Sequence, residues 1–403
     1  MTMTAAPAFT PARLRSSHLS VLVVFGLAGI AFASWASRIA DAKAELHLSA
    51  GALGATLLFA SAGSLVAMPS SGRIAGRLGA AQTIRVGMTL ALLGMGGIGL
   101  GVNVAHSRWV VAGALFFVGM GVGIWDVAMN LEGATVERLL GRTTMPHYHA
   151  AFSGGTVLSA FIGAGLSWGR VPILVHLLLT GGVVLLLGLW QLRLFLPRDL
   201  EASPAAEGEQ PAYESPQRSA WFERRTLLIG LVTLAAAFTE GTANDWLSVA
   251  FVEGHGVPHW AGVLAFAVFL TFMTIGRLVG TRILDTYGRV LVLRATFALA
   301  VLGALLVVFG PTWLAYAGAA VWGVGASLGF PVGMSASADD PARAAARMST
   351  VATIGYAAFI AGPPLLGFLG DHFGVLRSLL VVGALLAVAI LVVPAVREPQ
   401  RPA

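Results

Sequence analysis

The sequence contains no cysteine and few charged residues. Of its 403 residues, 11% are Asp, Glu, Lys or Arg, and Lys43 is the single lysine. The absence of cysteine excludes disulfide bonds and thiolate metal sites. Soluble domains carry about 25% charged residues, so the low charge excludes an ordinary soluble globular protein.

The residues that are abundant indicate a membrane protein. Hydrophobic residues make up 57% of the chain, the mean hydropathy is +0.81, and there are 50 glycines, a residue that is more frequent in transmembrane helices than in soluble ones. The formal net charge of +6 forms no basic run of the kind that binds nucleic acid, so we expect no nucleic-acid partner. The first apolar segment lacks a small-residue cleavage site and is interpreted as a retained helix.

Apolar runs long enough to cross a bilayer, about 20 residues each, occur twelve times. They lie at 18–39, 51–71, 83–104, 109–131, 147–167, 172–196, 226–251, 260–281, 290–309, 312–334, 348–369 and 377–396. The chain is therefore predicted to be an all-α polytopic protein with twelve transmembrane helices in two pseudo-symmetric six-helix bundles. The predicted divisions are a tail (1–17), a bundle (18–197), a linker (198–225), a second bundle (226–397) and a tail (398–403).

Arginine is concentrated in alternate loops. The loops with many arginines contain Arg13, Arg15, Arg73, Arg77, Arg85, Arg138, Arg142, Arg193, Arg198, Arg218, Arg224, Arg225, Arg282, Arg289, Arg294, Arg343, Arg347, Arg397 and Arg401. Cytoplasmic loops carry the excess of positive residues. We therefore expect an inner (plasma) membrane protein whose termini and linker are cytoplasmic.

Short glycine-containing segments recur 204 residues apart. Gly26 matches Gly230, and the pair Gly119 and Gly121 matches Gly323 and Gly325. Repeated six-helix halves are the architecture of many secondary transporters, which bind solute at the midplane between the repeats.

An acid in the fourth predicted helix is the leading functional candidate. Asp126 follows an uncharged apolar run, and a carboxylate at a helix centre costs about 2.5–3.5 kcal/mol to insert. Asn130 lies four residues later on the same helical face, so the pair fits a solute or proton pathway. The alternative is an acid that only joins two helices.

A second polar group lies in the seventh predicted helix. Glu240 is near its middle, with Asn244 one turn later and Asp245 beside it. We predict that Glu240 faces Asp126 across a cavity and that these two acids carry proton coupling. Gly241 is expected to weaken the helix there, and the alternative role of Glu240 is to support such a break.

Three aromatic or histidine side chains complete the predicted site. Trp35 and Trp246 are suited to stacking on a solute, or to anchoring at the membrane interface. His149 exchanges protons near neutral pH, or merely packs. The predicted solute site comprises Trp35, Asp126, Asn130, His149, Glu240, Asn244, Asp245 and Trp246.

Two loops carry related motifs. The segment from Gly72 to Gly79 reads GRIAGRLG, and Thr281 to Arg289 reads TRILDTYGR. They resemble the G-x-x-x-D-R-x-G-R signature of the major facilitator superfamily, in which this loop latches the gate. The first copy has Gly76 in place of the aspartate, which implies a weaker latch. The residues assigned to gating are Gly72, Arg73, Gly76, Arg77, Gly79, Asp285, Gly288 and Arg289.

Within that superfamily, further segments resemble the fucose-permease-related branch, which includes the YbjJ-like proteins. These segments begin at Ser34, Trp125, His147 and Glu240. Sugar symport in that branch depends on an acid in helix 4, which implies this role for Asp126. Many drug:proton antiporters have an arginine four residues before a glycine in helix 4, and here Leu115 stands at that position before Gly119.

The leading interpretation is a monomeric, proton-coupled secondary transporter that moves a small polar, sugar-like solute by alternating access. One alternative is proton-driven efflux of amphipathic compounds, which requires a larger apolar cavity. The other is a membrane sensor that keeps the fold without transport. We find no catalytic triad, metal-binding spacing or phosphate loop, so no enzyme activity, metal or cofactor is expected. Prolines at 331, 363 and 364 are expected to interrupt the tenth and eleventh helices.

Overall fold

The computed structural model describes residues 11–197, 219–340 and 343–398. Most of the linker predicted at 198–225 and nearly all of the terminal segment 398–403 lie outside the described residues. The described part is helical and contains no β-strand. Its helices are α1 (Pro11–Ala36), α2 (Ile39–Glu45), α3 (Ala50–Leu78), α4 (Ala80–Asn103), α5 (Arg108–Leu140), α6 (Met145–Trp168), α7 (Ile173–Gln191), η1 (Leu192–Leu194), η3 (Ala220–Phe222), α9 (Arg224–His255), α10 (His259–Phe309), α11 (Thr312–Ala326), α12 (Gly329–Ser337), α13 (Ala344–Phe373), α14 (Val375–Ser378), α15 (Leu380–Val392) and η4 (Val393–Val396).

Among the described residues, 11 helical stretches are long and apolar enough to cross a membrane. One of them, α10, has 51 residues and is divided at Gly288, where φ is 76° and ψ is 161°. At 1.5 Å per residue, such a length is about 76 Å, more than twice the hydrocarbon thickness of about 30 Å. The two parts of α10 therefore account for two crossings, and the predicted twelve-helix architecture is confirmed.

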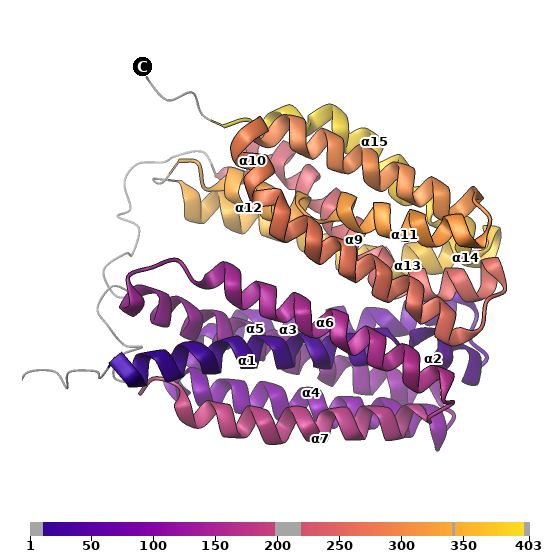
Figure 1. The fold of residues 1–403 in the computed structure, drawn as a ribbon, viewed down its shortest axis with the longest axis horizontal. Helices are drawn as coiled ribbons and strands as arrows, with labels where there is room; N and C mark the ends of the chain where they lie inside the picture. Colours follow the sequence, from indigo (N-terminus) through magenta and orange to yellow (C-terminus); the bar gives the residue numbers. More distant parts are fainter. Residues whose placement is uncertain (1–10, 198–218, 341–342, 399–403) are drawn as a thin grey trace, which may run out of the picture.

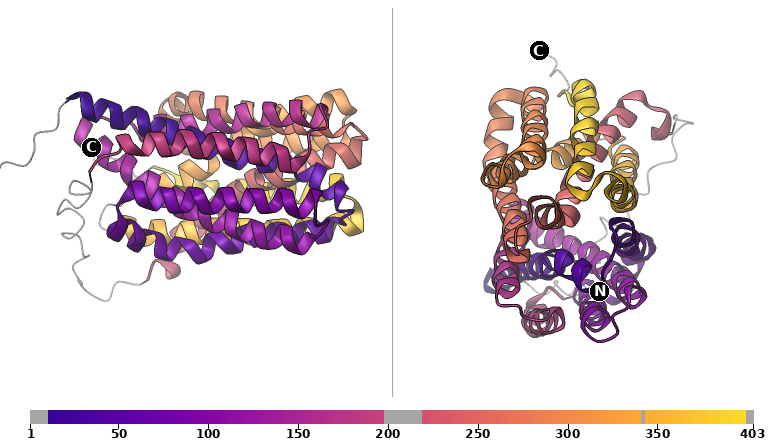
Figure 2. Two further views of the ribbon diagram at one scale, coloured as in Figure 1. Left: turned by 90° about the horizontal axis from the view of Figure 1, so that it is seen from below. Right: turned by 90° about the vertical axis from the view of Figure 1, so that its right-hand side faces the viewer.

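The helices form two bundles that lie side by side (Figure 1). The first contains α1 to α7 and the second α9 to α15, and the end view shows the two bundles one above the other (Figure 2, right). Equivalent glycines make equivalent contacts in each bundle. A Cβ at Gly119 would clash with the backbone of Ala60, and one at Gly323 would clash with that of Phe269.

The second pair of repeat-related glycines behaves in the same way. A Cβ at Gly121 would clash with the backbone of Ala91, and one at Gly325 with that of Ala300. The same helix pairs thus approach closely in both halves, because only a hydrogen atom stands where a side chain would intrude. The predicted repeat is a structural one.

The two halves contact each other at the end of the bundle opposite the chain termini. Ser49 donates to Asp371 over 3.1 Å, and Lys43 forms an ion pair with Glu253. At this end, a Cβ at Gly54 of α3 would clash with the backbone oxygen of Pro363 in α13, so the two helices touch through their backbones.

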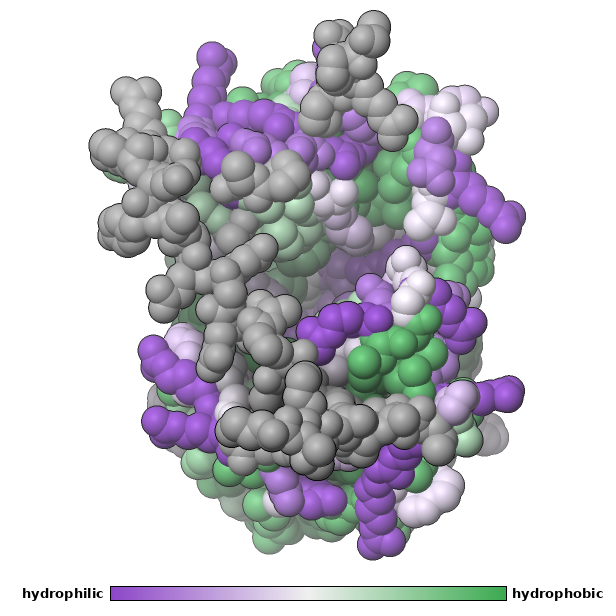
Figure 3. Space-filling model, turned by 90° about the vertical axis from the view of Figure 1, so that its left-hand side faces the viewer, coloured by the Kyte–Doolittle hydropathy of each residue, from purple (hydrophilic) through white to green (hydrophobic). Residues whose placement is uncertain are grey.

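The opposite end, which carries the termini, is more open. Arg73 and Arg77 are exposed, and a Cβ at Gly72 or Gly76 would meet nothing within 4 Å. Figure 3 shows this face, hollowed between the two halves. The halves are therefore closed at one end and separated at the other.

The predicted interruption at Pro363 and Pro364 is wrong, and the break at Gly241 that was kept open as an alternative is not present. Helix α9 runs continuously past Gly241, and α13 runs continuously through Pro363 and Pro364. The predicted tenth helix is interrupted, between Ala326 and Gly329, just before Pro331. The aromatic ring of Phe359 lies 3.1 Å from the position of a Cβ at Gly241. This packing supports α9 at a glycine that was expected to weaken the helix.

Candidate functional site

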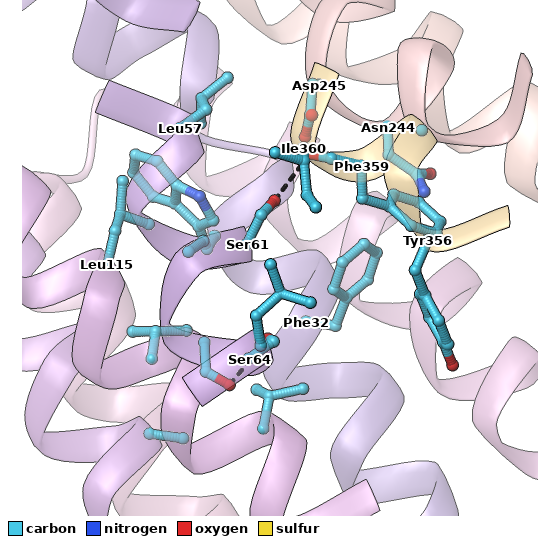
Figure 4. A pocket seen from close by; sticks show the side chains of 18 of the residues that line it. Phe32, Leu57, Ser61, Ser64, Leu115, Asn244, Asp245, Tyr356, Phe359 and Ile360 are labelled. Carbon is cyan, nitrogen blue, oxygen red and sulfur yellow. Dashed lines mark hydrogen bonds between the residues drawn. The ribbon is translucent and has the colours of Figure 1, made fainter. Parts of the chain in front are cut away.

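A cavity of about 280 Å³ lies between the two halves. Helices α1, α3, α4 and α5 of the first half and α9 and α13 of the second contribute to its wall (Figure 4). Its lining residues are Ala31, Phe32, Trp35, Leu57, Ala60, Ser61, Ser64, Leu65, Met68, Ala91, Met95, Leu115, Val118, Gly119, Val122, Gly241, Asn244, Asp245, Tyr356, Phe359 and Ile360. All of these positions lie within helical stretches that are long and apolar enough to cross a membrane, so the cavity lies in the membrane-spanning part of the bundles.

Most of this wall is apolar or aromatic. Trp35 and Phe32 contribute from α1, and Phe359 and Tyr356 contribute from α13. Leu115 occupies the position at which many drug:proton antiporters have an arginine. It is fully buried and lines the cavity. The wall is thus suited to the apolar body of a solute.

Two of the polar residues in the wall are already engaged with the backbone. Ser61 donates to the carbonyl of Phe359 over 2.7 Å and so joins α3 to α13 across the two halves. Ser64 donates to the carbonyl of Gly119 over 2.9 Å. Their hydroxyl protons are therefore used within the protein.

Adjacent residues of α9 supply the remaining acidic and amide groups. Asn244 and Asp245 both line the cavity (Figure 4). The Oδ1 atom of Asn244 is buried without a hydrogen-bond partner. No hydrogen bond or ion pair joins Asp245 to any other described residue. With the hydroxyl of Tyr356 and the indole N–H of Trp35, these two side chains supply the remaining polar groups of the wall.

Asp126 lies outside the cavity wall, half-buried in α5. Asn130 donates to its carboxylate over 3.2 Å and to its backbone oxygen over 2.9 Å, as their spacing predicted. Tyr356, which lines the cavity from the other half, is close enough to Asp126 to interact with it electrostatically. Asp126 therefore lies near a side chain of the cavity wall without a hydrogen bond to it.

Glu240 has a partner that the sequence analysis missed. Arg277 of α10 donates from Nη2 to Oε2 of Glu240 over 2.7 Å, and both side chains are mostly shielded, with 29% and 22% of their surfaces exposed. The available signal was an arginine inside the apolar run at 260–281, since intramembrane charges mark functional sites by default. Glu240 and Asp126 thus have different partners and no bond to each other.

The other predicted site residues fall in different environments. Trp35 is half-buried and lines the cavity, whereas Trp246 is fully buried and does not contact it. His149 is exposed, lies with its ring 5.3 Å from that of Phe25, and is within electrostatic range of Arg277. Three predicted site residues, Trp35, Asn244 and Asp245, therefore share the cavity.

At the closed end, Asp41 joins the two halves. Its ion pair with Arg38 spans 2.6 Å, and Nδ1 of His259 lies 2.7 Å from the other carboxylate oxygen. His259 belongs to α10, so this cluster bridges the first and second halves. Among the described residues, no group of three or more His, Asp or Glu side chains is arranged to hold a metal ion.

Comparisons with known proteins agree with this architecture. The family model described as Major Facilitator Superfamily matches residues 143–346 and 264–403. The chain belongs to the major facilitator superfamily. It is 30% identical to an uncharacterized transporter, y4wD, of Sinorhizobium fredii, over 96% of this chain and 100% of that protein. It is also 30% identical to an uncharacterized MFS-type transporter of Yersinia pestis, over 94% of each.

A solved structure shares the fold. A variant of the nucleoside transporter NupG superposes with a TM-score of 0.75 at 15% identity, covering 94% of this chain and 99% of that one. At this identity the likeness concerns the fold alone. The chain is thus a multi-pass membrane protein of a transporter superfamily, with homologues that are named as transporters.

The two loop motifs typical of the superfamily have equivalent backbones. Gly79 has φ 79° and ψ 160°, and Gly288 has φ 76° and ψ 161°, a conformation that side chains disfavour. Arg289 pairs with Asp339 over 2.7 Å within the second half. Asp285, the acid of the motif, is exposed. At this open end, Arg289 therefore stabilises its own half.

Proposed function

We propose that this superfamily member is a proton-coupled secondary transporter for a small amphipathic organic solute, moved by alternate opening of its two halves. The observation that carries the proposal is the cavity of about 280 Å³ between the halves, whose wall is mainly apolar and aromatic. A sugar needs many hydrogen bonds, since burying a hydroxyl without a partner costs free energy. Asn244, Asp245 and Tyr356 offer few, so the wall favours an amphipathic solute over a sugar-like one.

The arrangement of the halves supports alternating access. Their contacts at the end away from the termini include backbone contacts of α3 with α13 and the Asp41–His259 pair, while the end with the termini is hollowed (Figure 3). With the termini in the cytoplasm, as the arginine distribution predicts, this is a state open to the cytoplasm. Rocking of one repeat against the other would then open the opposite end.

We assign proton coupling to Asp126 rather than to Glu240. The charge of Glu240 is compensated by Arg277 over 2.7 Å, so its carboxylate has a permanent counter-ion. Asp126 has an amide partner, Asn130, and an electrostatic link to Tyr356 in the cavity wall. An occupant that moves Tyr356 changes the environment of Asp126, which gives a route from solute binding to proton binding.

Thermal melting of the purified protein with a compound panel tests the solute class, since a bound solute stabilises the native state by mass action. The panel contains sugars, sugar acids, nucleosides and neutral aromatic alcohols of matched size. We expect the aromatic alcohols to raise the melting temperature and the sugars to leave it unchanged. Stabilisation by sugars alone would indicate a sugar-like solute instead of an amphipathic one.

A further inference from the structure

Asp245 is distinguished from the other intramembrane acids by its lack of a partner. Glu240 has Arg277, and Asp126 has Asn130. Asp245 lies within α9, in the cavity wall, and no described residue donates a hydrogen bond to it or pairs with it. A carboxylate at membrane depth normally has such a partner, so the partner of Asp245 is either a proton or the occupant.

The cavity wall offers no cation of its own. None of the residues that line it is arginine, lysine or histidine. Arg277 is already bound to Glu240. Compensation of the Asp245 charge therefore has to come from whatever enters the cavity.

The surroundings of Asp245 fit an amine attached to an apolar body. Trp35, Phe32 and Phe359 line the same cavity (Figure 4), and aromatic faces attract ammonium groups as well as apolar surface. Asn244 adds a polar side chain beside Asp245 in the same wall. At about 280 Å³, the cavity lies near the lower limit for small-molecule pockets, which suits an arylalkylamine.

We infer that the solute carries a protonated amine, which pairs with Asp245 while its apolar body lies against the aromatic wall. The inference rests on the proposed function and adds the charge of the substrate.

The test compares ligands of the same shape and different charge. Binding of 2-phenylethylamine, tryptamine, 2-phenylethanol and 3-phenylpropanoate to the purified full-length protein is measured at pH 8 by thermal melting and equilibrium titration. We expect at least one amine to bind ten-fold or more tightly than the alcohol, and the carboxylate to bind weakest. Equal binding of amines and alcohol by the unaltered protein overturns the inference without any variant.

Variants then test whether Asp245 causes the preference for amines over the alcohol. Asp245→Asn should reduce it to less than two-fold, and Asp245→Glu, which keeps the charge, should retain part of it. Glu45→Gln makes the same carboxylate-to-amide change at an exposed site and should leave the preference unchanged. A preference that survives in folded Asp245→Asn overturns the inference, and so does binding of neither amine. Binding of the alcohol without amine preference leaves the proposed function standing, whereas binding of no aromatic probe contradicts both.

Discussion

Arg277 in α10 donates to Glu240 in α9 over 2.7 Å, joining two helices of the second half at membrane depth. Both charges are mostly shielded from water, and an unpaired charge in such a place is costly. The pair therefore stabilises the fold chiefly because each charge compensates the other. The relationship gives Glu240 a structural partner, and it leaves Asp126 and Asp245 as the acids free to respond to solute and proton.

Removal of one member of this pair should destabilise the protein more than removal of both. Arg277→Met leaves Glu240 without its cation, and loss of a hydrogen bond to a charged group costs about 1.5–3 kcal/mol. The double variant with Glu240→Leu should recover much of this loss. Melting temperatures of the two single variants and the double variant form the required cycle, and additive losses would show that the pair is not coupled.

A side chain at Gly54 should force the halves apart at the closed end. Its Cβ would clash with Pro363, whereas a Cβ at Gly165 of α6 meets nothing within 4 Å. The chain has no native cysteine, so cysteines at Lys43 and Glu253, which pair across the halves, report closure by cross-linking. We expect Gly54→Val to reduce cross-linking at least several-fold and Gly165→Val to leave it unchanged. Equal cross-linking in both would contradict the closed-end assignment.

The orientation in the membrane can be tested with exposed residues at opposite ends. His106 and Arg142 are both exposed, at the two ends of the segment that contains α5. If the loops with many arginines are cytoplasmic, an impermeant thiol reagent added to intact cells should label a cysteine at His106 and not one at Arg142. The reverse pattern would invert the topology and the assignment of the open end.

Glu223, just before α9, should give the fold an acid-sensitive contact. Its burial alone raises the pKa of the carboxyl group, but hydrogen bonds from Thr226 and Arg347, together with the positive charges of Arg347 and Arg343, outweigh this, so the pKa lies below its usual value. The bond from Arg347 is 2.7 Å long. A lowered folded-state pKa contributes stability above the unfolded value of about 4.3, and this is lost as pH falls through the folded pKa. Melting at pH 7 and pH 4 should therefore differ less in Glu223→Gln than in the unaltered protein.

The architecture was predictable because hydropathy and arginine distribution act locally along the chain. The Asp126–Asn130 hydrogen bond follows from helical spacing, and the repeat-related glycines mark helix contacts in both halves. The state of Asp245 was not predictable, since its lack of a partner depends on every helix around it. Nor was the continuity of α9 at Gly241, where the ring of Phe359 fills the space above the backbone.

The residues that line the cavity could not be predicted from the sequence, for a related reason. Ser61 and Tyr356 lie in glycine-rich apolar segments, where nothing in the sequence separates a lining position from a lipid-facing one. Arg277 was overlooked because the apolar run around it is long enough to dominate the hydropathy of that segment. An intramembrane charge carries more information than the average hydropathy around it.

The central claim is that solute and proton movements are coupled through Asp126. The most direct measurement is the pH change inside proteoliposomes when the compound that stabilises the protein most is added outside, read with a trapped pH dye. We expect a solute-driven pH change with the unaltered protein that protein-free liposomes do not show. With Asp126→Asn this change should be lost, while solute exchange across the membrane continues. An unchanged proton flux in Asp126→Asn would contradict the account.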